Sequence, residues 1–224
     1  MRWRIGFNPG KCGVLVVGQK KQKRLWKLGK ETIGESDEYK YLGVWINRQA
    51  NGLNHVQHLM QKASSSYSFV RAAKFWQGEE DIEAGAVIWE VVGISVLKYG
   101  SEVWACPSLD SERKLEQVQE RAGRTILGLS WQFPGVAIRG DMRWTRLKYG
   151  RHCKVLKFMG RVRGMGLERW PRIVAEALAG RFGTGTWADC RYTLLRKYGL
   201  LGKWKEENWT DKKTWSKLVM ETLK

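Results

Sequence analysis

The chain of 224 residues has few of the features that mark membrane or secreted proteins. Its longest apolar run, residues 84–97, contains Glu90 and is shorter than the roughly 18 to 20 residues needed to cross a bilayer. Near the N-terminus, the short apolar run at residues 13–17 is too brief for the apolar segment of a secretory signal peptide. The sequence therefore predicts neither a membrane-spanning helix nor a membrane partner.

Cysteines are few and widely separated, at Cys12, Cys106, Cys153 and Cys190. No two of them form a CxxC pair, which argues against a disulfide framework or a zinc ribbon. This usage favours an intracellular, reducing compartment, either the nucleus or the cytoplasm.

Catalytic and cofactor-binding motifs are also lacking. The sequence contains no G-x-S-x-G turn, no phosphate-binding loop ending in GK[ST] and no G-x-G-x-x-G after a strand. His55 and His58 are spaced to share one helix face, but no acid or cysteine joins them at metal-ligand spacing. The residues by themselves predict no catalytic group, no metal site and no bound cofactor.

Acidic residues are too few to balance the basic ones. The 40 Lys and Arg against 22 Asp and Glu give a net charge of +18. Residues 1–30 hold nine bases and no acid, and residues 139–172 hold eleven bases and two acids. A solvated basic face is one interpretation. Phosphate binding is the other, and it predicts RNA, an RNA–DNA hybrid or a DNA duplex as the partner.

Aromatic residues lie between the bases of both blocks, and the chain holds 13 Trp. Exposed rings among cations can stack on nucleic-acid bases. Their spacing, however, predicts that most of these rings belong to the core. The rings concerned are Trp3, Phe7 and Trp26 in the first block and Trp144, Phe158 and Trp170 in the second.

Residue periodicity predicts an α+β protein, with a small antiparallel sheet or hairpin at the N-terminus followed by a mainly α-helical bundle. Strands are expected at residues 13–17, 24–28 and 39–46. Helices are expected at residues 53–70, 82–100 (largely buried), 108–128 (with Ser108 or Asp110 as the N-cap), 142–149, 152–165, 171–182, 187–198 and 211–223. Linkers are expected at residues 180–185 and 199–208.

Four segments occur in a telling order: FNPGKCGVLVV (7–17), YKYLGVWI (39–46), ISVLKYGSEVWAC (94–106) and LEQVQERAGRTILGL (115–129). Together they resemble the C-terminal part of reverse transcriptases from non-LTR (LINE-type) retrotransposons. That part comprises late palm motifs D and E, the thumb and a following helical region. The resemblance implies a late-palm-like β region at 1–50, a thumb-like helical bundle at 51–180 and a C-terminal helical extension at 181–224.

The resemblance also implies roles for particular residues. Asn8 and Lys11 match motif D, whose Lys lies near the incoming nucleotide. Tyr41, Leu42 and Gly43 match the primer-grip strand, and the thumb helices would lie along the template–primer duplex. The predicted nucleic-acid-binding residues are therefore Lys11, Lys20, Lys21, Lys23, Arg24, Tyr41, Leu42, Gly43, Arg143, Arg146, Lys148, Arg151, Lys154, Arg161 and Arg163.

The metal-binding carboxylates of the polymerase do not occur in this sequence. Polymerase chemistry needs carboxylates that hold two magnesium ions, and the family supplies them from an FxxD motif and a Y-x-D-D turn. We therefore expect a truncated RNA-directed DNA polymerase, inactive alone, that binds at most template–primer nucleic acid, with Mg²⁺ only in the full-length enzyme. The alternatives are a self-contained basic nucleic-acid-binding protein and a degenerate transposon fragment with no selected function.

Overall fold

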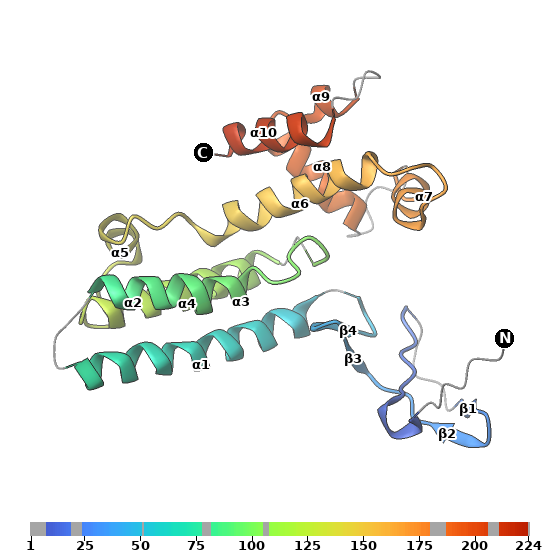
Figure 1. Cartoon of the computed structure of the whole chain (residues 1–224), viewed down its shortest axis with the longest axis horizontal. Coiled ribbons are helices and arrows are strands. Elements are labelled where there is room, and N and C mark those ends of the chain that lie inside the picture. The colour runs from blue at the N-terminus through green and yellow to red at the C-terminus, as the bar shows by residue number, and fades with distance from the viewer. Residues whose placement is uncertain are drawn as a thin grey trace. The chain divides into compact units, whose positions relative to one another are not determined.

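The computed structural model describes residues 8–18, 24–50, 52–77, 82–104, 108–179, 187–205 and 211–223. Over these residues the chain is α+β, with short antiparallel hairpins followed mainly by helices, as the sequence predicts (Figure 1). It divides into two compact units, Met1–His58 and Leu59–Lys224.

The first unit contains two antiparallel hairpins. Strand β1 (Trp26–Leu28) pairs with β2 (Glu31–Ile33), and β3 (Glu38–Tyr41) pairs with β4 (Val44–Asn47). The prediction of one strand over residues 39–46 was wrong. Leu42 and Gly43 both adopt positive φ, at 46° and 82°, and such a pair reverses the chain in a two-residue hairpin turn.

The apolar run at residues 13–17, predicted as a strand, does not form one. Val14 makes a single isolated bridge to Glu35, and a strand requires continuous pairing along an edge. A short 3₁₀ turn, Pro9–Lys11, precedes it. Asn8 caps this turn, because its Oδ1 accepts a hydrogen bond from the Gly10 backbone N–H at 3.0 Å.

Helix α1 (Leu53–Gln77) begins in the first unit, where its first turn packs on the β3–β4 hairpin. His55 Nδ1 accepts a hydrogen bond from the Trp45 backbone N–H at 3.3 Å. The His58 ring stacks on the Trp45 indole with ring centroids 4.1 Å apart. Both histidines therefore have protein partners that hold the hairpin against the helix.

The second unit is helical. It begins within α1 and then reverses direction several times (Figure 1). The elements that follow α1 are α2 (Ile82–Ile88), the π-helical η2 (Trp89–Ile94), α3 (Ser95–Leu97), α4 (Leu109–Ile126), α5 (Gly135–Asp141), α6 (Leu147–Arg163), α7 (Trp170–Ala177), α8 (Trp187–Lys197), α9 (Leu201–Lys205) and α10 (Lys212–Thr222).

Several predicted helices are confirmed with their ends. Ser108 caps α4, as its side chain accepts a hydrogen bond from the Ser111 N–H, and Gly128 beyond the helix has φ 67°. Asp211 caps α10 in the same way, through the N–H groups of Lys213 and Thr214. The caps and the apolar spacing point to the same boundaries in these two helices.

Three predictions in the second unit were wrong. Residues 142–149 are not one helix, because Arg143 has φ 52° and separates α5 from α6. Residues 199–208 contain the short helix α9 instead of only a linker. The segment 82–100 is not largely buried, since Val87 and Val91 lie more than half exposed. The predicted linker at 180–185 lies outside the described residues.

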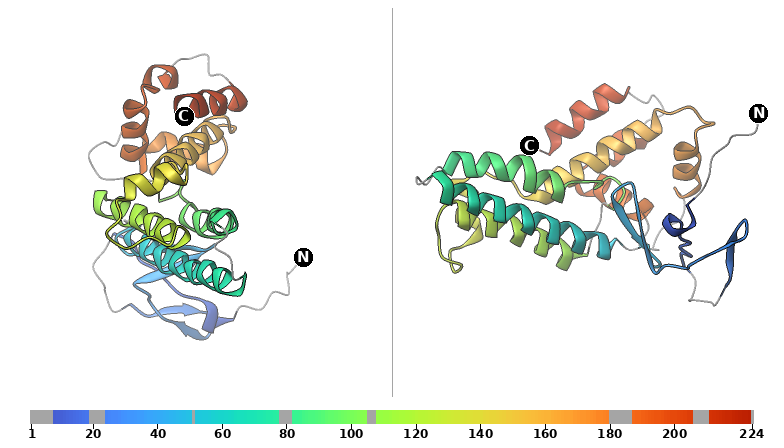
Figure 2. Two further views of the ribbon diagram at one scale, coloured as in Figure 1. Left: turned by 90° about the vertical axis from the view of Figure 1, so that its left-hand side faces the viewer. Right: turned by 60° about the horizontal axis from the view of Figure 1, so that its bottom comes forward.

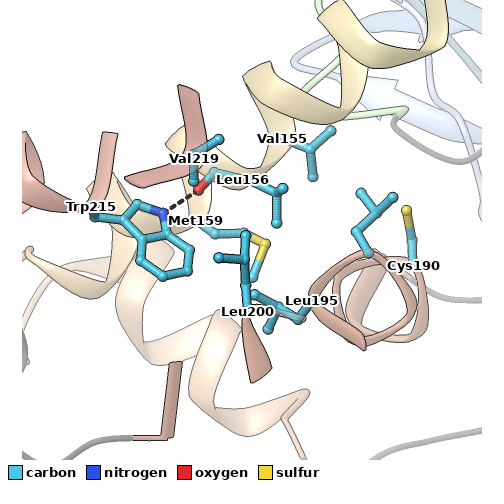
Figure 3. Packing of buried hydrophobic residues seen from close by; sticks show 9 residues of the cluster. Val155, Leu156, Met159, Cys190, Leu195, Leu200, Trp215 and Val219 are labelled. Atoms are coloured by element: carbon cyan, nitrogen blue, oxygen red, sulfur yellow. Dashed lines mark hydrogen bonds between the residues drawn. The ribbon is translucent and has the colours of Figure 1, made fainter. Parts of the chain in front are cut away.

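Helix α6 contributes to a hydrophobic core of the second unit (Figure 3). Its Leu156 and Met159 pack against Leu195 of α8 and Trp215 of α10. The Trp215 indole N–H donates a hydrogen bond to the Leu156 carbonyl at 2.7 Å. Figure 2 shows α10 alongside α6. The described part of the predicted C-terminal extension thus shares a core with α6.

The cysteines also depart from the prediction. Cys190 in α8 is disulfide-bonded, whereas Cys12 and Cys153 are free thiols. The wide spacing of cysteines along the chain carried no signal for this bond, because residues distant in sequence can meet in a helical core. A disulfide is the exception in reducing compartments. The predicted intracellular, reducing setting therefore gains no support from the cysteines.

Candidate nucleic-acid interface

Predicted binding residues of the first unit lie at its surface. Lys11 ends the Pro9–Lys11 turn with its side chain exposed, and Arg24 is exposed just before β1. Tyr41 and Leu42, at 61% and 75% exposure, form the tip of the β3–β4 hairpin with Gly43. The structure therefore brings the YLG residues together in a turn. Three further predicted residues, Lys20, Lys21 and Lys23, lie outside the described residues.

In the second unit, α6 presents a row of cations. Lys154, Lys157 and Arg161 follow at intervals of three and four residues, which places them on one helix face. Lys154 and Arg161 are exposed and Lys157 is half-exposed. We call these three residues the α6 stripe. Lys157 was missing from the predicted site, although its spacing from Lys154 and Arg161 could have identified it.

Exposed cations also flank the α6 stripe in sequence. Arg143 and Arg146 are exposed in the segment between α5 and α6, Lys148 is half-exposed in the first turn of α6, and Arg169 is exposed just before α7. The Lys148 ammonium lies 5.4 Å from the centroid of the Tyr149 ring. Arg169 was a further residue that the predicted site omitted.

Some cations on neighbouring helices have acidic partners. Arg113 and Lys114 of α4 both bind Asp110, at 2.9 and 2.7 Å, and Arg139 of α5 pairs with Glu120. Among the described residues, no carboxylate forms an ion pair with the α6 stripe or with the flanking cations Arg143, Arg146, Lys148 and Arg169. The Lys154 ammonium donates a hydrogen bond to the Lys98 carbonyl at 3.0 Å, and no described carboxylate neutralises the charge of these cations.

One aromatic ring of the second basic block is strongly exposed. Trp170, the first residue of α7, is 77% exposed and directly follows the exposed Arg169. Phe158 packs edge-on against Trp187, and Trp144 is half-buried. Most rings of this block are therefore packed against protein, and Trp170 is the one placed to stack on a base.

Arg151 does not belong to an exposed binding surface. Its side chain is 1% exposed, on the opposite side of α6 from solvent. One of its Nη atoms lies 3.3 Å from Glu112 Oε1, and the guanidinium lies 5.5 Å from the Trp104 ring centroid. Charge alone could not reveal this burial, because Arg151 fits the helical spacing of the core as well as that of the basic block. The predicted phosphate contact for Arg151 was wrong.

The ion pair of Arg151 is part of a polar network between three helices. His152 Nε2 lies 3.5 Å from Glu112 Oε1, and its Nδ1 lies 2.7 Å from the Tyr198 hydroxyl. The hydrogen bond with His152, aided by the charge of Arg151, lowers the pKa of Glu112 below its usual value. Burial raises the pKa of Tyr198 to about 12. This network is structural, since it fixes α4, α6 and α8 relative to one another.

Arg163, the last residue of α6, lies apart from the α6 stripe. Its guanidinium sits 4.9 Å from the centroid of the Trp204 ring and donates a hydrogen bond to the Trp204 carbonyl. It lines a cavity together with Arg172 and Arg191. The structure thus separates Arg163 from the predicted surface residues.

Within the seven described segments, no three His, Cys, Asp or Glu side chains gather in a way that could hold a metal ion. None of the helices in the described part of the chain is both long enough and apolar enough to span a membrane.

Comparison with protein-family models, with curated proteins and with solved structures finds no significant match. The resemblance to non-LTR reverse transcriptases therefore depends on the order of the sequence segments alone.

Proposed function

We propose that this chain binds template–primer nucleic acid, as the late-palm and thumb-like part of a non-LTR reverse transcriptase without polymerase activity of its own. The observation that carries the proposal is the α6 stripe: three cations on one helix face with no acidic partner among the described residues. The exposed Trp170 and Arg169 extend this surface at the start of α7.

The spacing of the stripe suits a polyanion better than a small acid. Successive side chains three and four residues apart on a helix lie about 5–6 Å from one another, so the three cations form a line along the axis. A line of positive charge matches a row of backbone phosphates. Binding releases the counterions condensed on those phosphates, which supplies affinity without sequence readout.

The sequence order supports the reverse-transcriptase form of the proposal. Three elements follow one another as they do in that family: the Asn8–Lys11 segment, the YLG tip and a YG-x-E-x-W element. The last of these is residues 99–104, within the ISVLKYGSEVWAC segment. The YLG residues form an exposed hairpin tip, which is accessible to a nucleic-acid strand. A self-contained nucleic-acid-binding protein would use the same cations but would show no preference for a hybrid duplex.

The proposal is tested by fluorescence anisotropy with a labelled RNA–DNA hybrid, a DNA duplex and a single-stranded RNA over a range of salt concentrations. We expect log affinity to fall linearly with log salt, with a slope of about −0.9 per phosphate contacted on duplex DNA. Tighter binding to the hybrid than to the DNA duplex favours the reverse-transcriptase origin. Equal affinity favours the self-contained binding protein. No binding at low salt contradicts both.

A further inference from the structure

A cavity of about 130 Å³ lies in the second unit between α6, α7, α8 and α9. Its apolar lining includes Met159 and Val162 of α6 and Ala175 of α7. Two indoles, Trp187 of α8 and Trp204 of α9, complete the walls. An apolar cavity of about 150 Å³ holds a benzene molecule, so this one has room for a single ring. It is smaller than the roughly 300–1,000 Å³ pockets of drug-sized ligands.

Three guanidinium groups line the same cavity, from Arg163, Arg172 and Arg191. Arg172 pairs with Glu176, which also lines the cavity. Arg191 lies 5.4 Å from the Trp187 ring centroid and, among the described residues, forms no ion pair with a carboxylate. The cavity therefore combines apolar and aromatic walls with a cation that no carboxylate of the described segments neutralises.

The electrostatic surroundings of Arg191 also favour the binding of an anion in this cavity. Burial lowers the pKa of the Arg191 guanidinium, which means that the protein surroundings disfavour its charge. Burial and the neighbouring charge of Arg172 lower the pKa of Arg163. An anion placed between these groups would form charge-assisted hydrogen bonds with fork-shaped donors and offset their mutual repulsion.

We propose that this cavity binds one pyrimidine nucleotide, with the base against Trp187 and Trp204 and the phosphate on Arg191. A base is a flat ring that can stack on an indole face, and a phosphate is the anion that a guanidinium binds in bidentate fashion. The cavity holds the base alone, so the sugar and phosphate lie toward its mouth. The nucleotide can come from two sources, a free mononucleotide or the unpaired end of a bound strand.

The choice of a nucleotide over other aromatic anions rests on the proposed function. The cavity is lined by α6 and α7, the same two helices that carry the α6 stripe and Trp170. A strand bound along the stripe would thus have its nucleotides near the helices that form the cavity. No residue of the α6 stripe lines the cavity, so the two proposals can fail independently.

The test is isothermal titration of the full chain with uridine monophosphate, uridine and inorganic phosphate as separate probes. We expect uridine monophosphate to bind at least about tenfold more tightly than either half, because the ring and the anion are held together. Arg191→Gln should weaken that binding about tenfold or more, since a charge-assisted bond is lost. Arg196→Gln is the matched control, an exposed arginine of the same helix that does not line the cavity.

A second variant addresses the ring subsite. Ala175→Leu would place three further carbons in the cavity and should abolish nucleotide binding while the chain remains folded by circular dichroism. The source of the nucleotide is identified by comparing the affinity for a hybrid that has one unpaired terminal nucleotide with the affinity for a blunt hybrid. A preference for the overhang that Arg191→Gln removes assigns the site to a strand end. Binding of the free mononucleotide without such a preference assigns it to the free ligand.

Two results separate this inference from the proposed function. In the first result, binding of the hybrid weakens with salt, but Arg191→Gln changes neither the binding of the mononucleotide nor the preference for the overhang. The cavity proposal is then overturned, and the proposal for the α6 stripe is unaffected. If uridine monophosphate binds through Arg191 but no hybrid or duplex binds at low salt, the proposed function is overturned and the cavity is a mononucleotide site.

Discussion

The Tyr198 hydroxyl lies 2.7 Å from Nδ1 of His152, and this hydrogen bond connects the end of α8 to the middle of α6. The opposite ring nitrogen of His152 faces Glu112 of α4 at 3.5 Å. One imidazole therefore joins three helices. Because α6 also carries the α6 stripe, this network holds the candidate interface in place.

The phenol of Tyr198 makes stability depend on pH in the alkaline range. Burial raises its pKa from an ordinary 10.0 to about 12, so the folded state holds the proton more tightly than the unfolded chain. The resulting stabilisation is complete below about pH 10 and is lost as pH rises toward 12. We expect Tyr198→Phe to remove this part of the alkaline loss in urea-unfolding measurements. Tyr41→Phe, at an exposed hairpin tip, is the control and should leave the loss intact.

The Glu112–Arg151 pair should show strong coupling in a double-mutant cycle. Arg151→Met leaves Glu112 without its guanidinium partner, and we expect a loss of about 3 kcal/mol, the lower end for breaking a buried pair, because Glu112 keeps His152 and some water. Glu112→Gln should cost a similar amount by leaving Arg151 buried without a carboxylate. The double variant should lose far less than the sum. Additive losses in chemical denaturation would show that the two residues do not interact.

The same carboxylate makes stability depend on pH in the acidic range. The hydrogen bond with His152, followed by the charge of Arg151, lowers the pKa of Glu112 from an ordinary 4.5. The stabilisation is therefore present above about pH 4.5 and is lost as pH falls below it. We expect acid unfolding of Glu112→Gln to lack this component when followed by circular dichroism. An acid transition identical to that of the unaltered chain would contradict the assignment.

Two glycines in helices should respond to alanine in opposite directions. A Cβ at Gly160 in α6 would overlap the Trp215 indole, which is buried, so Gly160→Ala should destabilise the second unit by about 1–3 kcal/mol. A Cβ at Gly140 in α5 would meet no atom within 4 Å, so Gly140→Ala should stabilise by up to about 1 kcal/mol through helix propensity. Thermal unfolding measures both. A gain at Gly160 would contradict the close packing of α6 and α10.

The hairpin turn at Leu42–Gly43 predicts a stabilising change in the first unit. Leu42 is a non-glycine residue with φ 46°, and asparagine tolerates this conformation better than leucine. We expect Leu42→Asn to stabilise the β3–β4 hairpin by about 0.5–1 kcal/mol in hydrogen exchange of its backbone amides. Slower exchange would agree with the turn, and faster exchange would indicate that the leucine side chain is needed for packing.

The parts of the fold that could be predicted are those where local signals agree. In α4, Leu115, Val118, Ala122 and Ile126 repeat at helical spacing, all four are buried, and the Ser108 cap marks the start. The YKYLGVWI segment misled because its residues all favour a strand, while the reversal depends on backbone angles at Leu42 and Gly43. Likewise, α5 was missed because its glycines lower helix propensity, although packing keeps it helical.

The candidate site was only partly predictable for a different reason. A charge block identifies which residues are basic but not which face of a helix they occupy, so Lys154 and Arg161 were found together with the buried Arg151. The cavity at Arg191 could not be predicted, because its walls come from four separate helices. Its only sequence signal was a tryptophan four residues before an arginine, at helical spacing.

The most direct measurement of the central claim compares two charge-reversed variants that have the same net charge. One replaces the α6 stripe, Lys154, Lys157 and Arg161, with glutamate. The other replaces three lysines of α10, Lys212, Lys213 and Lys217, which are exposed and form no ion pair with a described carboxylate. Binding of the labelled RNA–DNA hybrid is then followed by anisotropy against salt.

We predict that the stripe variant loses most of its affinity for the hybrid. The slope of its log affinity against log salt should become less steep, by the equivalent of about three phosphate contacts. The α10 variant should keep the original slope. Equal losses in the two variants would mean that only net charge matters. That result would contradict binding at the α6 stripe.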